Sequence, residues 1–164
     1  MKQLNKIIPL ILLSVFMYTG CGDGFLDKVD RTAINSGTFY QTEEDALASV
    51  NAVYAHLQNI SLWGRRIHFM LDFSSDEIGP TANTQGPPSE LLQHTFGSAG
   101  NEHIVEPWQM FYKTIARANI TIDEVADMEI SDELKNRVMG EARFLRALSY
   151  FYINTLWNGG PLRT

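Results

Sequence analysis

Residues 140–162, with the sequence GEARFLRALSYFYINTLWNGGPL, restrict the fold more than any other part of the chain. Apolar residues recur here and just upstream at steps of three and four, the spacing of one helix face: Leu134, Val138, Leu145, Leu148, Tyr152 and Leu156. Further aromatic residues widen this stripe around nearly the whole circumference: Phe144, Tyr150, Phe151 and Trp157. Such a helix needs partners on several sides. The sequence Asn-Gly-Gly-Pro at 158–161 then ends it, because glycine accepts a left-handed cap and proline cannot continue a helix.

An earlier helix is predicted from Thr42 to about Asn59. Thr42 and Asp45 have the spacing of a capping box, and Glu43 and Glu44 place negative charge at the positive end of the helix dipole. One face of this segment is apolar at helical spacing: Ala46, Leu47, Val50, Val53, Tyr54 and Leu57. We expect this helix to serve packing.

A second strong helix is predicted to open at Glu106, with Pro107 at its first position. It carries a continuous apolar seam about five turns long, formed by Trp108, Phe111, Ile115, Ala118, Ile122 and Val125. Asn119 lies at the edge of this seam, where a polar side chain usually bonds a neighbouring turn or fixes register. A connector of residues 128–130 leads to Ser131, which begins the third helix, so these two helices should pack antiparallel.

The charged residues of the third helix are interpreted as structural. Arg137 and Glu141 lie four residues apart and can form a weak pair. Arg143 and Arg146 flank an apolar dipeptide on a helix expected to be buried. Each is therefore expected to need an acceptor, from helix-end carbonyls or from an acid on another helix.

The middle of the chain is less regular. Residues 60–76 fit a strand and a helix about equally well, and the basic pair Arg65–Arg66 is interpreted as a solvated face. Residues 75–106 are punctuated by glycine and proline, and a loop of about thirty residues is uncommon unless it is functional or disordered. It contains amide and aromatic side chains of the kind that bind neutral polar ligands such as sugars: Asn83, Gln85, Phe96 and Asn101. A mobile surface loop without a ligand is the alternative interpretation of this composition.

The N-terminus has the order of a secretory signal: two lysines, an apolar run of about a dozen residues, then small residues before Cys21. Residues 18–21, Tyr-Thr-Gly-Cys, resemble the lipobox of bacterial lipoproteins, in which the cysteine thiol receives the lipid. A plain signal peptide with a chance cysteine nearby would have the same order. We predict a signal peptide at 1–20, a lipidated tether at 21–41 and a helical domain at 42–164.

The sequence lacks the residues that several classes of function require. The formal net charge of −6, without a basic cluster, disfavours nucleic acid as a partner. No catalytic constellation or cofactor motif is present, and Asp76–Glu77 is interpreted as a turn cap. No metal-ligand spacing joins the four histidines, His56, His68, His94 and His103.

The string Glu-Ala-Arg-Phe-Leu-Arg-Ala, followed by aromatic residues and Gly-Gly-Pro-Leu, resembles the signature helix of the SusD/RagB family. Phe25-Leu26-Asp27 resembles the start of mature members, and Ile115 to Asn119 is similar to a family Ile-x-x-x-Asn pattern. The residues interpreted as a structural signature are Trp108, Asn119, Glu141, Arg143, Phe144, Leu145 and Arg146.

The resemblance implies an all-α fold of tetratricopeptide-like helix pairs. It also implies an outer-membrane lipoprotein, surface-exposed and held by its lipid, that captures oligosaccharides or other nutrients without catalysis. Its partner would be a TonB-dependent transporter, and no cofactor is implied. Members of the family are several times longer, so a truncated fragment stays open. A membrane-anchored helical scaffold that binds a protein stays open as well, as does a fragment of a secreted enzyme.

Overall fold

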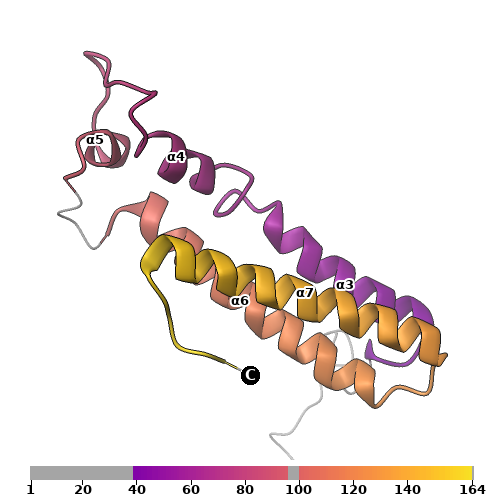
Figure 1. Cartoon of the computed structure of the whole chain (residues 1–164). Helices are drawn as coiled ribbons and strands as arrows, with labels where there is room; N and C mark the ends of the chain where they lie inside the picture. The colour runs from indigo at the N-terminus through magenta and orange to yellow at the C-terminus, as the bar shows by residue number, and fades with distance from the viewer. Residues whose placement is uncertain (1–38, 96–99, 164) are drawn as a thin grey trace, which may run out of the picture. The chain divides into compact units, whose positions relative to one another are not determined.

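The computed structural model describes residues 39–95 and 100–163. These residues form five helices and contain no strand, which confirms the all-α prediction; the tetratricopeptide-like pairing stays a prediction. The helices are α3 (Glu43–Leu57), α4 (Arg66–Asp72), α5 (Pro87–Leu92), α6 (Glu102–Ala126) and α7 (Asp132–Trp157) (Figure 1). Within the described residues, none of these helices is both long and apolar enough to cross a lipid bilayer.

Helix α3 begins as its sequence predicts. The Asp45 amide donates to Thr42 Oγ1 over 3.2 Å, and the Thr42 amide donates to Asp45 Oδ2 over 2.9 Å. This capping box satisfies two amides that have no partner inside the helix. Hydrogen bonds to the Asp45 carboxylate lower its pKa, led by the one that Thr42 Oγ1 donates to Asp45 Oδ2 over 2.8 Å.

Helices α6 and α7 form the antiparallel pair predicted from their short connector (Figure 1). Five of the six predicted seam residues of α6 are buried, and Trp108 is half-buried. The predicted start of α6 is wrong by one turn, because α6 begins at Glu102 and holds Pro107 in its interior. Asn101 supplies the cap instead, since its Oδ1 accepts the His103 amide over 3.0 Å.

Helix α7 buries a narrower face than its sequence predicts. The fully covered positions are Val138, Ala142, Leu145, Ser149 and Ile153. Leu148, Tyr152 and Leu156 are only half-buried, while Phe144 and Phe151 are 61% and 60% exposed. The expectation of an all-round buried helix is therefore wrong, because α3 and α6 cover only one side of α7. Arg143 is exposed too, so its predicted need for a buried acceptor does not arise.

Two hydrophobic cores lie along the bundle. The aliphatic core joins α3, α6 and α7, and consists of Ala46, Val50, Val53, Ala118, Ile122, Val125, Met128, Val138, Ala142 and Leu145. The aromatic core contains Leu62, Ile67, Phe111, Ile115 and Ile153. Its rim is largely aromatic and half-buried, and includes Trp63, Trp108, Tyr112, Tyr150, Tyr152 and Trp157.

The irregular middle of the chain contains two short helices. Residues 60–76 form turns and then α4, which settles the ambiguity in favour of a helix. The predicted loop of residues 75–106 is interrupted by α5, which buries Leu91 completely. The loop prediction is therefore wrong in extent, because Pro87 and Pro88 open a helix here and do not only break structure.

Helix α7 ends where the sequence predicts. Asn158 takes the left-handed conformation with φ of 59°, and Gly159 follows with φ of 113°. Asparagine is one of the few side-chain-bearing residues that visit this region readily. The chain then turns back beside the bundle as residues 158–163, which we call the tail (Figure 1).

Candidate functional site

The segment that joins α4 to α5 carries two of the predicted ligand-binding residues. Asn83 and Gln85 are both exposed, and the segment between α4 and α5 projects beyond the bundle of α3, α6 and α7 (Figure 1). The Thr81 amide donates to Thr84 Oγ1 over 3.1 Å, which closes a turn around Asn83. Phe96 lies outside the described residues.

Asn101, the fourth predicted ligand residue, is only 1% exposed. Its Nδ2 donates to the carbonyl of Pro87 over 3.0 Å and to Glu90 Oε2 over 2.9 Å. Its Oδ1 caps α6 through the His103 amide. The whole amide is thus engaged inside the protein, where it fixes α5 against the start of α6.

Arg66 fixes α4 to α6 through two acids. Its Nη1 pairs with Glu102, and its Nε donates to Glu106 Oε2 over 3.1 Å. Ser61 Oγ donates to the same Glu106 oxygen over 2.9 Å. This bond, together with Arg66, lowers the pKa of the Glu106 carboxyl. The interpretation of Arg65–Arg66 as a solvated pair is wrong for Arg66, whose side chain is 11% exposed, because its acceptors lie 36 and 40 residues away.

His103 is buried beside this ion-pair cluster. Its ring stacks on Phe69 with centroids 4.8 Å apart and an interplanar angle of 2°. Neither ring nitrogen has a hydrogen-bond partner among the described residues. Burial, followed by the charge of Arg66, lowers the pKa of His103, which disfavours the protonated ring. The described residues contain no group of three metal-binding side chains.

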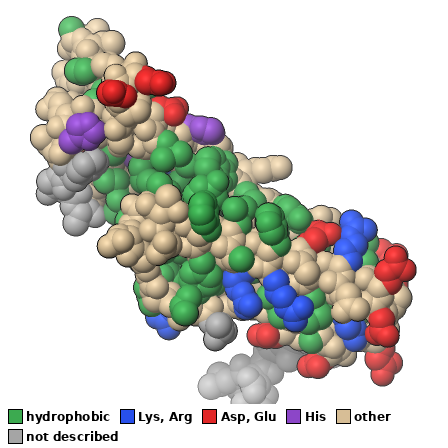
Figure 2. Space-filling view, in the orientation of Figure 1, with side chains coloured by type: hydrophobic (Ala, Val, Ile, Leu, Met, Phe, Trp, Pro, Cys, Tyr) green, Lys and Arg blue, Asp and Glu red, His purple; other side chains and the backbone are tan. Residues whose placement is uncertain are grey.

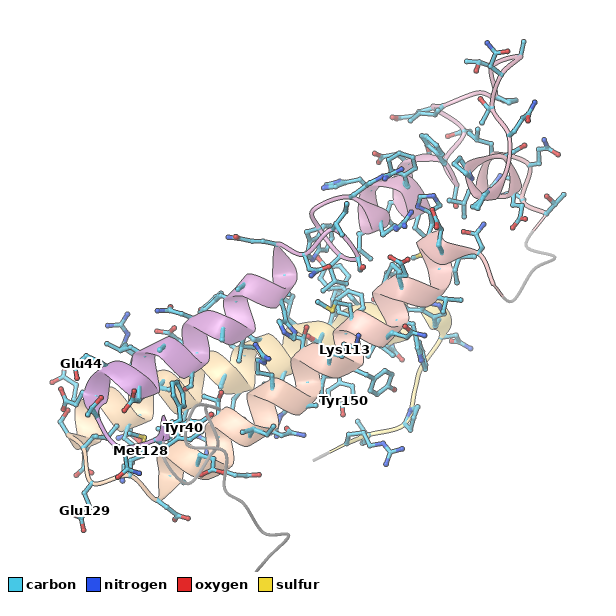
Figure 3. All side chains as sticks on the ribbon, turned by 180° about the vertical axis from the view of Figure 1, so that it is seen from behind. Tyr40, Glu44, Lys113, Met128, Glu129 and Tyr150 are labelled. Carbon is cyan, nitrogen blue, oxygen red and sulfur yellow. The ribbon has the colours of Figure 1, made fainter. Side chains whose placement is uncertain are left out.

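The tail is held against α6 and α7 by side chains that bind its backbone. Tyr112 Oη donates to the carbonyl of Pro161 over 3.0 Å. The Arg163 carbonyl accepts from Asn119 Nδ2 over 3.1 Å and from Tyr150 Oη over 2.9 Å. Figure 3 labels Tyr150 on α7, in the part of the bundle that the tail passes. Asn119 therefore connects the tail to the bundle.

Arg146 orients Asn119 for this contact. Its Nη1 donates to Asn119 Oδ1 over 2.8 Å, so the amide nitrogen of Asn119 faces the tail. The predicted need of Arg146 for an acceptor is confirmed, although the acceptor is an amide oxygen and neither an acid nor a helix-end carbonyl. Elsewhere in the signature, Glu141 accepts from Arg137 over 2.9 Å as predicted, and Leu145 is fully buried.

A cavity of about 400 Å³, which we call the tail pocket, lies between the tail and α6. It is lined by Trp108, Gln109, Tyr112, Lys113, Pro161 and Arg163. A second cavity of about 400 Å³ lies among α4, α6 and α7, and its lining is mostly apolar. Sequence reasoning assigned Trp108 to the packing seam and Pro161 to the end of the last helix, and it did not single out the other four residues. The polar side chains beside that seam were the available signal.

Comparison with known proteins gives a consistent result. A family model for SusD-like proteins, described as starch-binding and associating with the outer membrane, matches residues 25–164. SusD-like protein P25 of Formosa agariphila is 32% identical over 100% of this chain, which covers 32% of that protein. SusD-like protein P38 of the same organism is 27% identical over 97% of the chain, covering 30% of that protein.

A SusD-like protein of Bacteroides ovatus is 28% identical over 93% of the chain and 27% of its own length. The chain thus spans about a third of the length of the curated relatives it matches. No solved structure matches it significantly.

Proposed function

The chain belongs to the SusD-like family, and on this premise we propose that it is an outer-membrane lipoprotein that binds oligosaccharides or other nutrients. In this proposal it delivers its ligand to a TonB-dependent transporter and catalyses no reaction. The observation that carries the proposal is the family match over residues 25–164, with its description of starch binding at the outer membrane.

The anchor in this proposal is Cys21. Residues 1–20 act as a signal peptide, residues 21–41 as a lipidated tether, and residues 42–164 as the helical domain. Several acyl chains on one residue give a stable attachment to a membrane without a transmembrane helix. The lipid then holds the protein at the cell surface, beside its transporter.

The ligand contacts in this proposal centre on the segment between α4 and α5. Asn83 and Gln85 have exposed amides that can donate to and accept from sugar hydroxyls. The ring of Phe96 is proposed to stack on a sugar face. Asn101 holds α5, which follows this segment, because its side-chain amide is engaged by Pro87, Glu90 and His103.

The first experiment tests the anchor. Cells that express the full chain are labelled with radioactive palmitate, and the protein is followed in the membrane fraction. We expect label and membrane attachment with Cys21 and neither with Cys21→Ser. Label in neither protein, with the signal segment still attached, would contradict the anchor.

The second experiment tests ligand binding by calorimetry on the full chain in detergent. We expect heat with at least one oligosaccharide, and weaker binding by the double variant Asn83→Ala with Gln85→Ala. The matched control is Asn136→Ala, which removes an exposed amide from α7. Equal binding by both variants would remove Asn83 and Gln85 from the site.

A scaffold that binds a protein is the second candidate, and one observation favours it. Phe144 and Phe151 are seven residues apart on the outer side of α7 and are each about 60% exposed. Figure 2 also shows hydrophobic side chains gathered over the middle of the bundle, with acidic side chains toward both ends. Capture of a membrane partner that Phe144→Ser with Phe151→Ser abolishes, without heat from any glycan, would favour this scaffold.

A further inference from the structure

We propose that the tail pocket is a second ligand subsite, which accepts a sugar residue carrying an anionic group such as a uronate carboxylate or a sulfate ester. The inference rests on the proposed nutrient-binding function and adds to it a ligand class. It concerns a site on α6 and the tail, separate in sequence from the predicted contacts at Asn83 and Gln85.

The size and walls of the pocket suit a sugar. Its volume of about 400 Å³ is within the range of roughly 300–1,000 Å³ that is usual for small-molecule sites. Trp108 and Tyr112 pack with ring centroids 5.0 Å apart at 58°, and Trp157 meets Trp108 edge-on at 5.5 Å. Trp108 is thereby held in place while part of its ring stays exposed, so it offers a fixed apolar surface to the C–H face of a sugar.

The charge of the lining selects an anion. Lys113 and Arg163 are both exposed and both line the pocket, and no carboxylate lines it, although the chain as a whole has a formal net charge of −6. None of the ion pairs among the described residues includes either cation. A carboxylate or sulfate would receive charge-assisted hydrogen bonds from them, which are stronger than bonds between neutral groups.

The nearest acid does not cancel this charge. Glu106 lines an adjoining cavity together with Gln109 and Lys113. Its carboxylate is already engaged by Arg66 and Ser61, which lie on the α4 side of α6. Lys113 takes part in no ion pair among the described residues, and Figure 3 shows it on the middle part of α6.

The position of Arg163 is prearranged by the tail. Its carbonyl is fixed by Asn119 and Tyr150, and the carbonyl of Pro161 is fixed by Tyr112. Gly160 lies so close to Trp108 that a β-carbon there would be 3.0 Å from the indole ring. A backbone held at this many points keeps Arg163 beside the pocket before any ligand arrives, which lowers the cost of ordering the tail on binding.

The neutral polar groups of the tail pocket can also bind a sugar. The Tyr112 hydroxyl donates its proton to Pro161, so its remaining lone pair can accept from a sugar hydroxyl. Gln109 adds an exposed amide that can donate and accept. The pocket thus combines an aromatic surface, neutral hydroxyl-binding groups and two cations.

The test compares three oligosaccharides of equal length by calorimetry on the full chain: a galacturonic acid trimer, a sulfated galactose trimer and neutral galactotriose. We expect one or both anionic trimers to bind more tightly than the neutral one. Their affinity should fall as salt rises from about 50 to about 300 mM, since salt screens exposed charges. Whichever anionic trimer binds more tightly identifies the anionic group.

The double variant Lys113→Gln with Arg163→Gln should weaken binding of the anionic trimer by roughly ten- to a hundredfold, the scale expected for losing charged hydrogen bonds. Binding of neutral sugar should not change. The matched control, Arg117→Gln with Arg143→Gln, removes two exposed cations that do not line the pocket. Both pairs are exposed, and thermal melting verifies that each variant folds.

The outcomes separate the two proposals. Anionic trimer binding that both double variants leave unchanged would overturn the subsite, as would equal affinity for all three trimers. Neutral binding that depends on Asn83 and Gln85, without any gain from an anionic group, would overturn the subsite and keep the proposed function. Absence of heat with any glycan would overturn both.

Discussion

The aliphatic core and the aromatic core are built on the same two long helices, yet their surroundings differ. The aliphatic core fills the space between α3, α6 and α7 with aliphatic side chains, none more than 9% exposed. The aromatic core has a rim of half-buried rings, and the ion pairs of Arg66, the tail and both cavities of about 400 Å³ adjoin it. Aromatic side chains pack along one edge and still offer a ring face or a hydroxyl to the surface. One end of the bundle therefore serves packing, while the other can also present a site.

The largest expected effect comes from opening the aliphatic core. Leu145 is fully buried there, so Leu145→Ala should lower the free energy of unfolding by roughly 2–5 kcal/mol, measured by urea denaturation. The control is the neighbouring Phe144→Ala, which should change stability by less than about 0.5 kcal/mol because Phe144 is 61% exposed. Similar losses at both positions would mean that α7 is covered on both sides.

This pair of neighbours also marks the limit of what the sequence could predict. Helical spacing and capping chemistry were sufficient to predict the start of α3, the antiparallel pairing of α6 with α7 and the end of α7. They could not decide which side of α7 is covered, because residues 144–157 are apolar in nearly every direction. The covered side depends on where α3 lies, and that is a contact between segments far apart in the chain.

The candidate sites were harder to predict for a similar reason. Arg66 and Asn101 look like ordinary exposed polar residues, yet the acceptors of their side-chain nitrogens lie between 11 and 40 residues away. Trp108 fits the packing seam equally well with or without a pocket beside it. The pocket exists because the tail folds back, and no local pattern in the sequence encodes that return.

The second prediction tests the polar link between α4 and the aromatic end. Arg66→Met leaves Glu102 and Glu106 without their cation, so we expect a loss of about 1–3 kcal/mol. Amide hydrogen exchange should increase most in α4, which depends on this link. Arg65→Met is the matched control: Arg65 is exposed and contacts the Phe69 ring at 4.9 Å, a contact worth at most about 1 kcal/mol. Unchanged exchange in α4 would show that Ile67 alone holds it.

The third prediction concerns how the stability of the protein depends on pH through two histidines, His103 on α6 and His56 on α3. Burial lowers the pKa of His103 below its ordinary value of 6.5, with Arg66 and Arg65 acting in the same direction and Glu102 and Glu106 opposing them. Below about pH 6.5 the unfolded chain therefore binds a proton that the folded chain does not, and stability falls as pH drops from about 7.5 to about 5.5. Replacing the ring by His103→Phe keeps the stack on Phe69 and removes this proton.

His103→Phe should therefore melt about as well at about pH 5.5 as at about pH 7.5, apart from the contribution of His56. Burial, Arg117 and Lys113 lower the pKa of His56 in the same way, so His56→Phe supplies the comparison. At the lower pH we expect His103→Phe to be more stable than the wild type by about 1 kcal/mol, because two buried ring nitrogens without hydrogen-bond partners are removed. If the melting temperature of the double variant His56→Phe with His103→Phe depended on pH as strongly as that of the wild type, both histidines would be excluded as the cause.

The smallest expected effect compares one substitution at two glycines. Gly140 lies inside α7 with open space where a β-carbon would be, so Gly140→Ala should stabilise the fold by about 0.5–1 kcal/mol. The same change at Gly160 should destabilise it, because the new methyl group would overlap the Tyr112 hydroxyl and lie 2.9 Å from Ile153 Cγ2. Thermal melting gives the sign of each change, and tryptophan fluorescence reports whether the tail leaves Trp108. If Gly160→Ala were neutral with unchanged fluorescence, the tail would not be tightly held at the aromatic end, and the prearranged position of Arg163 would lose its support.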